Sequence, residues 1–216
     1  MEKKELSPKV LATYQAIVEL FMEGADLSSL TVSEITARAG IGKGTVYDYF
    51  ANKEEMLAGA LCYEMEMACS ELYERIRTKE NLYERMEQIL LDMERHMQKV
   101  GCAFKVFHLL MDNSQVSKEL KEILRRKKGY EIPVFVLLRE LIIEELGEES
   151  QLSGEDVTYL VMNTVSRLIC YTMYLNHDEA VRFSDSRMIR ERLCRDICKD
   201  VEEGKQSAAA GERIMK

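Results

Sequence analysis

The sequence predicts an all-α protein. It contains only 2 prolines and 11 glycines among 216 residues, while aliphatic, methionine and charged residues dominate, a composition typical of helical proteins. Apolar residues recur three and four positions apart along most of the chain, which is the spacing of one helix face. The stretch from Thr31 to Leu57 contains two short helical patterns separated by glycines. These observations predict a helical chain that includes a helix-turn-helix.

The first helix is predicted to begin at Pro8 and to end near Gly24. Ser7 is a favoured N-cap residue, and proline is favoured at the first helical position. Apolar residues then follow at helical spacing, namely Tyr14, Ile17, Val18 and Phe21. We expect this helix to brace the helix-turn-helix from behind.

The helix-turn-helix has recognisable end signals. Thr31 suits an N-cap, and Glu34 three residues later completes a capping-box pattern, so a helix is expected from about Val32 to Ala39. Gly40 then stands where a glycine commonly ends a helix. A second helix is expected from about Lys43 to Phe50.

This second helix is predicted to present a surface that reads DNA. Val46 and Phe50 share one face and are expected to be buried. A major groove admits one helix and offers base edges and phosphates to polar groups. Asp48 has two interpretations, a hydrogen bond accepted from cytosine N4 or exposure to solvent, and the second is preferred. The outward residues are small, polar or aromatic, namely Lys43, Gly44, Thr45, Tyr47, Asp48 and Tyr49.

The stretch from Thr31 to Leu57 closely resembles the N-terminal DNA-binding domain of the TetR (tetracycline-repressor-like) family of transcriptional regulators. The resemblance rests on the pattern T-V-x-E-I-x-x-x-A-G-I-G-K-G-T-V-Y-x-Y-F-x-N-K-E-E-M-L over 27 consecutive residues. Elsewhere the chain resembles the family only in length and helical character. The resemblance implies a homodimeric regulator that binds a palindromic site on double-stranded DNA, as a repressor released by a small molecule.

The predicted DNA contacts come from residue chemistry and from the resemblance. Lys43 is expected to reach a guanine edge or a phosphate, Gly44 to permit close approach, and Thr45 to contact a base or its methyl group. The resemblance implies base or phosphate contacts for Tyr47 and Tyr49. The remaining predicted contacts are to the DNA backbone, by Lys53 through the resemblance and by Thr31 and Arg38.

We expect three regions along the chain. These are a DNA-binding domain over residues 1–53, an effector-binding and dimerisation domain over 54–203, and a disordered tail over 204–216. Asn52 is expected to cap a fourth helix that starts near Lys53. Pro133 predicts a kink or break, because proline lacks an amide donor and clashes with the preceding turn. Later helices are expected near residues 82–100, 104–111, 118–146, 153–175 and 186–201.

The second domain is expected to bind an apolar or aromatic small molecule and to form the dimer. Its last two helices are predicted to pair with their symmetry mates as a four-helix bundle. Residues 155–175 are apolar on more than one face, and Ile189, Leu193, Ile197 and Val201 recur in a row. Methionine and aromatic residues also suit a ligand cavity, and the candidates are Met93, Phe104, Phe107, His108, Met111, Tyr130, Phe135, Met162 and Tyr171.

Charge and targeting signals limit the function classes. The formal net charge is −8, yet residues 1–53 carry 6 Lys/Arg against 7 Asp/Glu, so the acidity lies mainly outside the reading domain. Non-specific affinity for DNA should therefore be modest. No run of about 18 apolar residues and no signal-peptide core occurs. The six cysteines lie inside helical patterns, which favours a reduced, cytoplasmic protein.

Two alternatives to a ligand-released repressor remain open. One is a helical module that docks another protein. The other is a regulator that senses oxidants through cysteine thiols, for which Cys62, Cys69 and Cys102 are the candidates. His96, His108 and His177 are scattered, and no H-E-x-x-H, Cys-x-x-Cys or P-loop pattern occurs. Cys194 and Cys198 share a helix face, for which structural burial is the preferred interpretation. The sequence therefore predicts no enzyme, no metal site and no cofactor.

Overall fold

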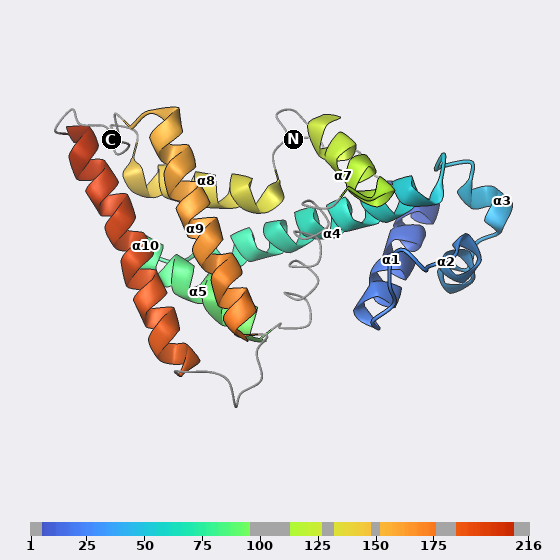
Figure 1. Ribbon diagram of the computed structural model, residues 1–216, viewed down its shortest axis with the longest axis horizontal. Coiled ribbons are helices and arrows are strands. Elements are labelled where there is room, and N and C mark those ends of the chain that lie inside the picture. The colour runs from blue at the N-terminus through green and yellow to red at the C-terminus, as the bar shows by residue number, and fades with distance from the viewer. Residues whose placement is uncertain (1–5, 96–112, 127–131, 148–151, 176–184, 210–216) are drawn as a thin grey trace. The chain divides into compact units, whose positions relative to one another are not determined.

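The structure, a computed structural model, describes residues 6–95, 113–126, 132–147, 152–175 and 185–209. Every element in these ranges is a helix, which confirms the expected all-α class (Figure 1). With the labels of Figure 1, the helices are α1 (Pro8–Met22), α2 (Val32–Ala39), α3 (Lys43–Val46), α4 (Lys53–Ile76), α5 (Leu82–Arg95), α7 (Gln115–Arg126), α8 (Pro133–Leu146), α9 (Gly154–Leu175) and α10 (Ser186–Ala209).

The chain forms two compact units. The N-terminal unit comprises Met1–Ala68 and Cys102–Glu131, and the C-terminal unit comprises Cys69–Gly101 and Ile132–Lys216. α4 is one continuous helix whose residues run from the first unit into the second. α7 is grouped with the N-terminal helices, and α5, α8, α9 and α10 make up the C-terminal unit. These two units are defined by how the helices pack. The functional boundary between a DNA-binding domain ending at residue 53 and an effector-binding domain starting at residue 54 stays a prediction.

The expected caps organise the N-terminal unit. The Ser7 hydroxyl accepts a hydrogen bond from the amide of Val10 at 3.3 Å. Gly40 ends α2 with a φ of 66°, a left-handed conformation that glycine adopts without strain. The side chain of Asn52 accepts from the amide of Glu55 at 2.7 Å and so caps α4. Each of these ends lies where the local sequence predicted it.

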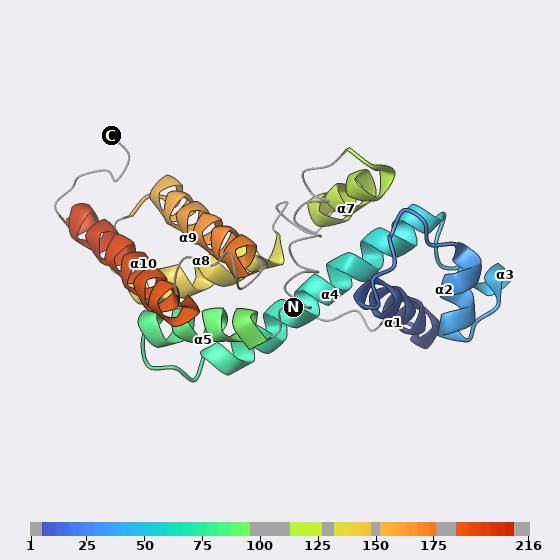
Figure 2. The ribbon, with the colours of Figure 1, turned by 60° about the horizontal axis from the view of Figure 1, so that its bottom comes forward.

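A small apolar core holds the first three helices together. α1 packs against both α2 and α3, and Figure 2 shows these three helices grouped near the start of α4. Burial of this apolar surface is the main stabilising contribution. The side chains at the centre are almost fully buried, namely Ile17, Ile35, Val46, Phe50, Met56 and Leu57.

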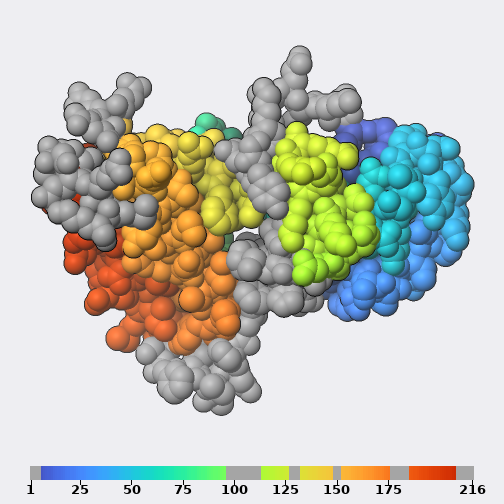
Figure 3. All heavy atoms as spheres, turned by 45° about the horizontal axis from the view of Figure 1, so that its top comes forward, coloured from blue at the N-terminus to red at the C-terminus, as the bar shows by residue number. Residues whose placement is uncertain are grey.

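The C-terminal unit has a larger core. α10 packs against α5, α8 and α9, and α8 packs against α9. Figure 3 shows α9 in orange and α10 in red side by side on one face of this unit. Its core contains side chains from all four helices, including Leu90, Leu138, Leu141, Leu160, Tyr171, Cys194 and Ile197.

One polar group lies at the edge of that core. The Tyr171 hydroxyl is within hydrogen-bond reach of the Glu94 carboxylate and lies 3.3 Å from the carbonyl oxygen of Ser186. Arg190 donates to the same carboxylate at 2.5 Å. Burial and the bond to Glu94 raise the pKa of the Tyr171 hydroxyl above its usual range. The group joins α5, α9 and the start of α10.

Three expected helix bounds need correction. α3 ends at Val46 instead of Phe50, because Gly44 and the β-branched Thr45 and Val46 have low helix propensity. The helix expected from residue 118 begins at Gln115, where the Ser114 hydroxyl accepts from the amide of Ser117. The last helix continues past Val201 to Ala209, since the run Ser-Ala-Ala supports a helix.

The remaining expectations concern breaks and the tail. The break at Pro133 is confirmed, because the proline opens α8 after Ile132 in an extended conformation. The Ser153 hydroxyl caps α9 by accepting from the amide of Asp156 at 3.2 Å. Residues 204–209 of the expected disordered tail are helical. The short helix expected at 104–111, residues 96–100 of the expected 82–100 helix, and residues 210–216 lie outside the described residues.

Candidate nucleic-acid interface

Residues 43–50, called the reading segment below, combine a buried face with an exposed one. α3 is continued by a tight turn in which the amides of Asp48 and Tyr49 donate to the carbonyls of Thr45 and Val46. The amide of Phe50 also donates to the carbonyl of Val46, at 3.2 Å. Val46 is 1% exposed and Phe50 6%, which anchors the segment on the N-terminal core.

The exposed face carries polar groups that have no partners within the described part of the chain. Tyr47 and Tyr49 are 48% and 42% exposed, and Lys43 and Asp48 are also exposed. Among the described residues, these four side chains take part in no hydrogen bond or ion pair. Open space surrounds Gly44, where an added Cβ would meet nothing within 4 Å. The segment therefore offers donors, acceptors and aromatic rings to an external ligand.

Tyr14 of α1 fixes the end of this segment against α4. Its ring lies 5.7 Å from that of Phe50 and 5.8 Å from that of Tyr63, measured between centroids. Gly59 allows this approach, because a Cβ there would lie 2.3 Å from the Tyr14 hydroxyl oxygen. Burial raises the pKa of Tyr14 to about 12, helped by the nearby Cys62 and Glu55. Sequence patterns did not reveal this contact, since the residues come from different helices.

Three of the predicted DNA contacts are engaged within the chain, and Thr31 is the first. Its hydroxyl accepts from the amide of Glu34 at 3.2 Å and lies 2.7 Å from the Glu34 carboxylate, which also accepts from the amide of Thr31. The capping box is thus complete, as predicted. These bonds to Thr31 hold the pKa of Glu34 below its usual value.

Arg38 forms a brace between α2 and α1. Its two terminal nitrogens donate to the two carboxylate oxygens of Glu23, each at 2.8 Å, and one of them lies 3.4 Å from Glu19. The hydrogen bonds from Arg38 lower the pKa of Glu23. A sequence signal was available, since Glu19 and Glu23 stand four residues apart on one face of α1.

Lys53 supports the loop that leads into α2. Its ammonium group donates to the carbonyl oxygens of Ser28 and Leu30 at 3.1 and 3.0 Å. Thr31, Arg38 and Lys53 therefore hold α2 and the loop before it through internal contacts, and their contacts with DNA stay predictions. Lys43, Gly44, Thr45, Tyr47 and Tyr49 lie together on the reading segment as expected.

The predicted effector residues are only partly described. Met93 and Phe135 are half-buried against the C-terminal core, and Tyr171 lies within it at 2% exposure. Met162 is 55% exposed on the outer face of α9, so it does not lie with Tyr171. The remaining candidates lie outside the described residues, namely Phe104, Phe107, His108, Met111 and Tyr130.

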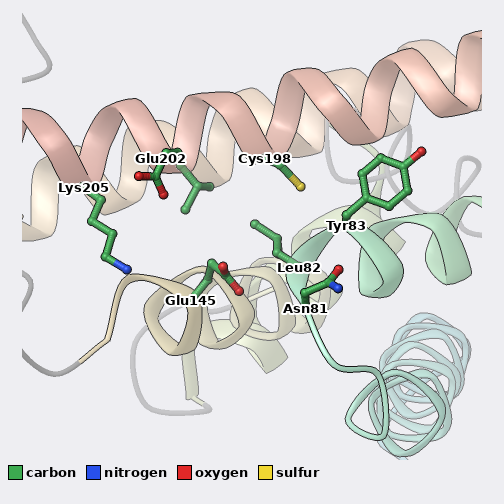
Figure 4. Close-up of a pocket in the computed structure, with 8 residues that line it drawn as sticks. Asn81, Leu82, Tyr83, Glu145, Cys198, Glu202 and Lys205 are labelled. Carbon is green, nitrogen blue, oxygen red and sulfur yellow. The ribbon is translucent and has the colours of Figure 1, made fainter.

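One pocket of about 260 Å³ lies in the C-terminal unit, between the start of α5, the end of α8 and α10. Figure 4 shows side chains from the three helices around it. It contains none of the predicted effector residues, and its lining mixes charged and apolar groups, namely Asn81, Leu82, Tyr83, Glu145, Cys198, Val201, Glu202 and Lys205. Within the described ranges, no group of side chains suits a metal ion, and no helix is long and apolar enough to cross a membrane.

The outer face of α9 carries several exposed apolar side chains, beside the polar Thr158 and Ser166. Tyr159, Met162 and Met173 are 41%, 55% and 50% exposed, and Cys170 on the same side is also exposed. The apolar row expected on α10, which includes Ile197 and Val201, does not form a second exposed apolar face. Ile197 and Val201 are 1% and 2% exposed because they pack into the core of their own unit.

Comparison with known proteins agrees with this architecture. The family described as bacterial regulatory proteins, tetR family, matches residues 14–60. The fatty acid metabolism regulator protein of Bacillus subtilis is 28% identical over 132 residues, which cover 59% of this chain and 64% of that protein. The chain spans 20% and 64% of the lengths of two curated relatives that it matches.

Solved structures share the fold at low identity. A tetR-family transcriptional regulator from Streptomyces coelicolor has a TM-score of 0.60 at 14% identity, covering 95% of this chain and 90% of that one. The transcriptional regulator FadR from Bacillus subtilis, solved with stearoyl-CoA, has a TM-score of 0.55 at 19% identity, covering 90% and 98%. The helix-turn-helix thus matches the tetR family of bacterial regulatory proteins over residues 14–60, and most of the chain shares the fold of solved tetR-family regulators.

Proposed function

We propose that this protein is a DNA-binding transcriptional repressor that acts as a homodimer and leaves a palindromic operator when a small molecule binds. The observation that carries the proposal is the reading segment, whose exposed polar side chains have no partners within the described chain. Two of these side chains are tyrosines, Tyr47 and Tyr49, which are 48% and 42% exposed instead of packing into the core. This is a binding function, exercised in the bacterial cytoplasm, and it needs no catalytic group.

We assign DNA binding to residues 1–53, and effector binding and dimerisation to residues 54–203. α4 supports this assignment, because it is a continuous helix that leads from the reading unit into the C-terminal unit. A shift of the C-terminal part of a rigid helix is transmitted to its start without loss in a flexible linker. In a dimer, such a shift changes the spacing of the two reading segments.

The outer face of α9 is the surface that best supports a dimer. Its exposed apolar side chains would bury large areas against a second copy, and a two-fold axis brings the same face of each copy together. α10 lies beside α9 and adds the exposed Met188. A four-helix bundle of α9, α10 and their symmetry mates therefore stays the preferred arrangement.

Lys43→Ala and Tyr49→Ala are each expected to weaken operator binding by about 1–3 kcal/mol if these side chains contact bases. The operator is first obtained by selecting wild-type protein against random duplexes, and affinities are then measured by fluorescence anisotropy. Lys118→Ala, on the exposed side of α7, removes the same charge and serves as the control. Operator affinities that match the control in both variants would contradict the assigned surface.

A long acyl group is a concrete candidate for the effector. The fatty acid metabolism regulator among the relatives, and the FadR structure with stearoyl-CoA, support an apolar ligand of this kind. The described pocket is too small and too charged for such a chain, because ligand pockets typically measure about 300–1,000 Å³ and are mostly apolar. We therefore do not assign the effector to it.

Stearoyl-CoA is expected to weaken operator binding, with a coupling free energy of about 1–3 kcal/mol. Linkage requires the operator to weaken stearoyl-CoA binding by the same factor. Titration calorimetry measures the affinity for stearoyl-CoA in the presence and in the absence of operator. Coenzyme A without the acyl chain is the control. Equal stearoyl-CoA affinities in the two titrations would exclude this ligand as the releasing effector.

The alternative of a thiol-based sensor makes a different prediction. Burial raises the pKa of Cys194 to about 12 and that of Cys198 to about 11, and the thiolate is the reactive form. With a thiol-alkylating reagent at neutral pH, native protein is expected to react at the exposed Cys170 while the buried Cys194 reacts only after unfolding. Mass spectrometry identifies the modified residues. Rapid native labelling of Cys194 would support the sensor instead.

A docking module for another protein is the second alternative. It would use the same exposed tyrosines but would show no preference among DNA sequences. The selection against random duplexes separates the two functions, because a docking surface enriches no motif.

A further inference from the structure

Asp48 lies on the exposed face of the reading segment. It stands two residues after Val46 and two before Phe50, the buried anchors of the segment. It lies in the tight turn that follows α3, and its side chain is exposed. Gly44 of the same segment leaves open space around it. The Asp48 carboxylate is therefore accessible to a ligand of the reading segment.

The other acidic side chains near it have structural roles. Glu23 pairs with Arg38, Asp26 accepts from the Ser28 amide and hydroxyl, and Glu34 completes the capping box of α2. Glu55 accepts from the amide of Ala51 at 2.6 Å. Glu54 lies in the first turn of α4, where the helix dipole favours a negative charge.

Asp48 has no such role within the described part of the chain. Its amide takes part in the turn, but its carboxylate has no hydrogen bond or ion pair there. An exposed carboxylate on a segment that enters DNA is repelled by phosphates. That cost is offset where the carboxylate accepts a hydrogen bond from a base edge.

Cytosine is the base that suits a carboxylate. In the major groove, cytosine presents its N4 amino group as a donor, while guanine presents two acceptors and thymine one acceptor and a methyl group. Adenine has a donor at N6, but its neighbouring N7 acceptor repels the second carboxylate oxygen. An ionised carboxylate accepts and does not donate, so it discriminates among these patterns.

We propose that Asp48 is a specificity-determining residue that accepts a hydrogen bond from cytosine N4 in each half-site of the operator. The proposal rests on the proposed DNA binding and adds the base that one side chain reads. Asp48 contributes selectivity more than affinity, because its charge opposes binding to every sequence that lacks a donor at that position.

Selection against random duplexes with sequencing tests this directly. Wild type is expected to enrich a motif with cytosine at one position of each half-site. Asp48→Asn is expected to change that position to adenine, because an amide both donates to N7 and accepts from N6. Asp48→Ala is expected to lose the preference there, with discrimination falling by about tenfold or more, while the rest of the motif is kept.

Glu64→Gln is the matched control, because it removes one negative charge from α4 of the same unit, away from the reading segment. Its motif should equal that of wild type, and thermal melts of all variants report on folding. If wild type and Asp48→Asn enrich the same motif, the proposed role of Asp48 is overturned, while the proposed DNA binding is kept. A wild-type selection without any motif would instead contradict the proposed DNA binding.

Discussion

Aspartate in place of both Met162 and Met173 is expected to convert the dimer into a folded monomer that has lost specific operator binding. Both side chains are at least half exposed on the outer face of α9, so the substitutions leave the core of their own unit intact. In the dimer they would bring four charges into an apolar interface, which is strongly unfavourable. Sedimentation velocity at micromolar concentration should show the monomer mass.

The loss of operator binding follows from the loss of the second reading segment. Two linked half-sites bind with an effective concentration that can raise affinity about 10²–10⁴-fold over one. Anisotropy titrations should therefore show a loss of at least about a hundredfold. Ile143→Asp, which introduces the same charge at a 44% exposed residue of α8, should remain dimeric. An unchanged dimer in the double variant would exclude the outer face of α9 as the interface.

Ile197→Asp is expected to unfold the C-terminal unit. The side chain is 1% exposed and lies in the core formed by α5, α8, α9 and α10. Replacing it removes a buried aliphatic group and places an unpaired carboxylate in apolar surroundings, at a cost of more than about 4 kcal/mol. That is a large fraction of the roughly 5–15 kcal/mol that stabilises a typical domain.

Chemical denaturation followed by circular dichroism measures this effect. Ile143→Asp makes the same exchange on α8 of the same unit, where the side chain is 44% exposed, and should unfold near the wild-type midpoint. A folded, monomeric Ile197→Asp variant would mean that Ile197 faces the partner copy, as the sequence pattern alone suggested.

The contrast between Ile197 and Met162 shows where sequence reasoning works. Local signals depend on neighbouring residues, so the capping box at Thr31, the glycine end at Gly40 and the break at Pro133 were predicted correctly. Helix periodicity marks an apolar face, but it does not say whether that face meets its own chain or a second copy. The apolar row on α10 packs against its own chain.

The reading segment was predicted from its pattern, and its supports were not. The exposed face and the two buried anchors follow from helical spacing, although the helix itself is shorter than expected. The brace from Arg38 to Glu23 and the bonds from Lys53 to two loop carbonyls join residues 15 or more positions apart. A basic residue in a predicted DNA-binding domain is easily interpreted as a phosphate contact. The sequence does not show which basic side chains already bind carboxylates or carbonyl oxygens of their own chain.

The affinity of wild-type protein for duplexes with two, one or no half-sites tests the central claim most directly. All three duplexes have equal length and are titrated at one salt concentration, since non-specific binding depends strongly on salt. Removing one inverted half-site is expected to lower affinity at least about a hundredfold, and scrambling both half-sites should lower it further. Equal affinity for all three duplexes would contradict a sequence-reading dimer.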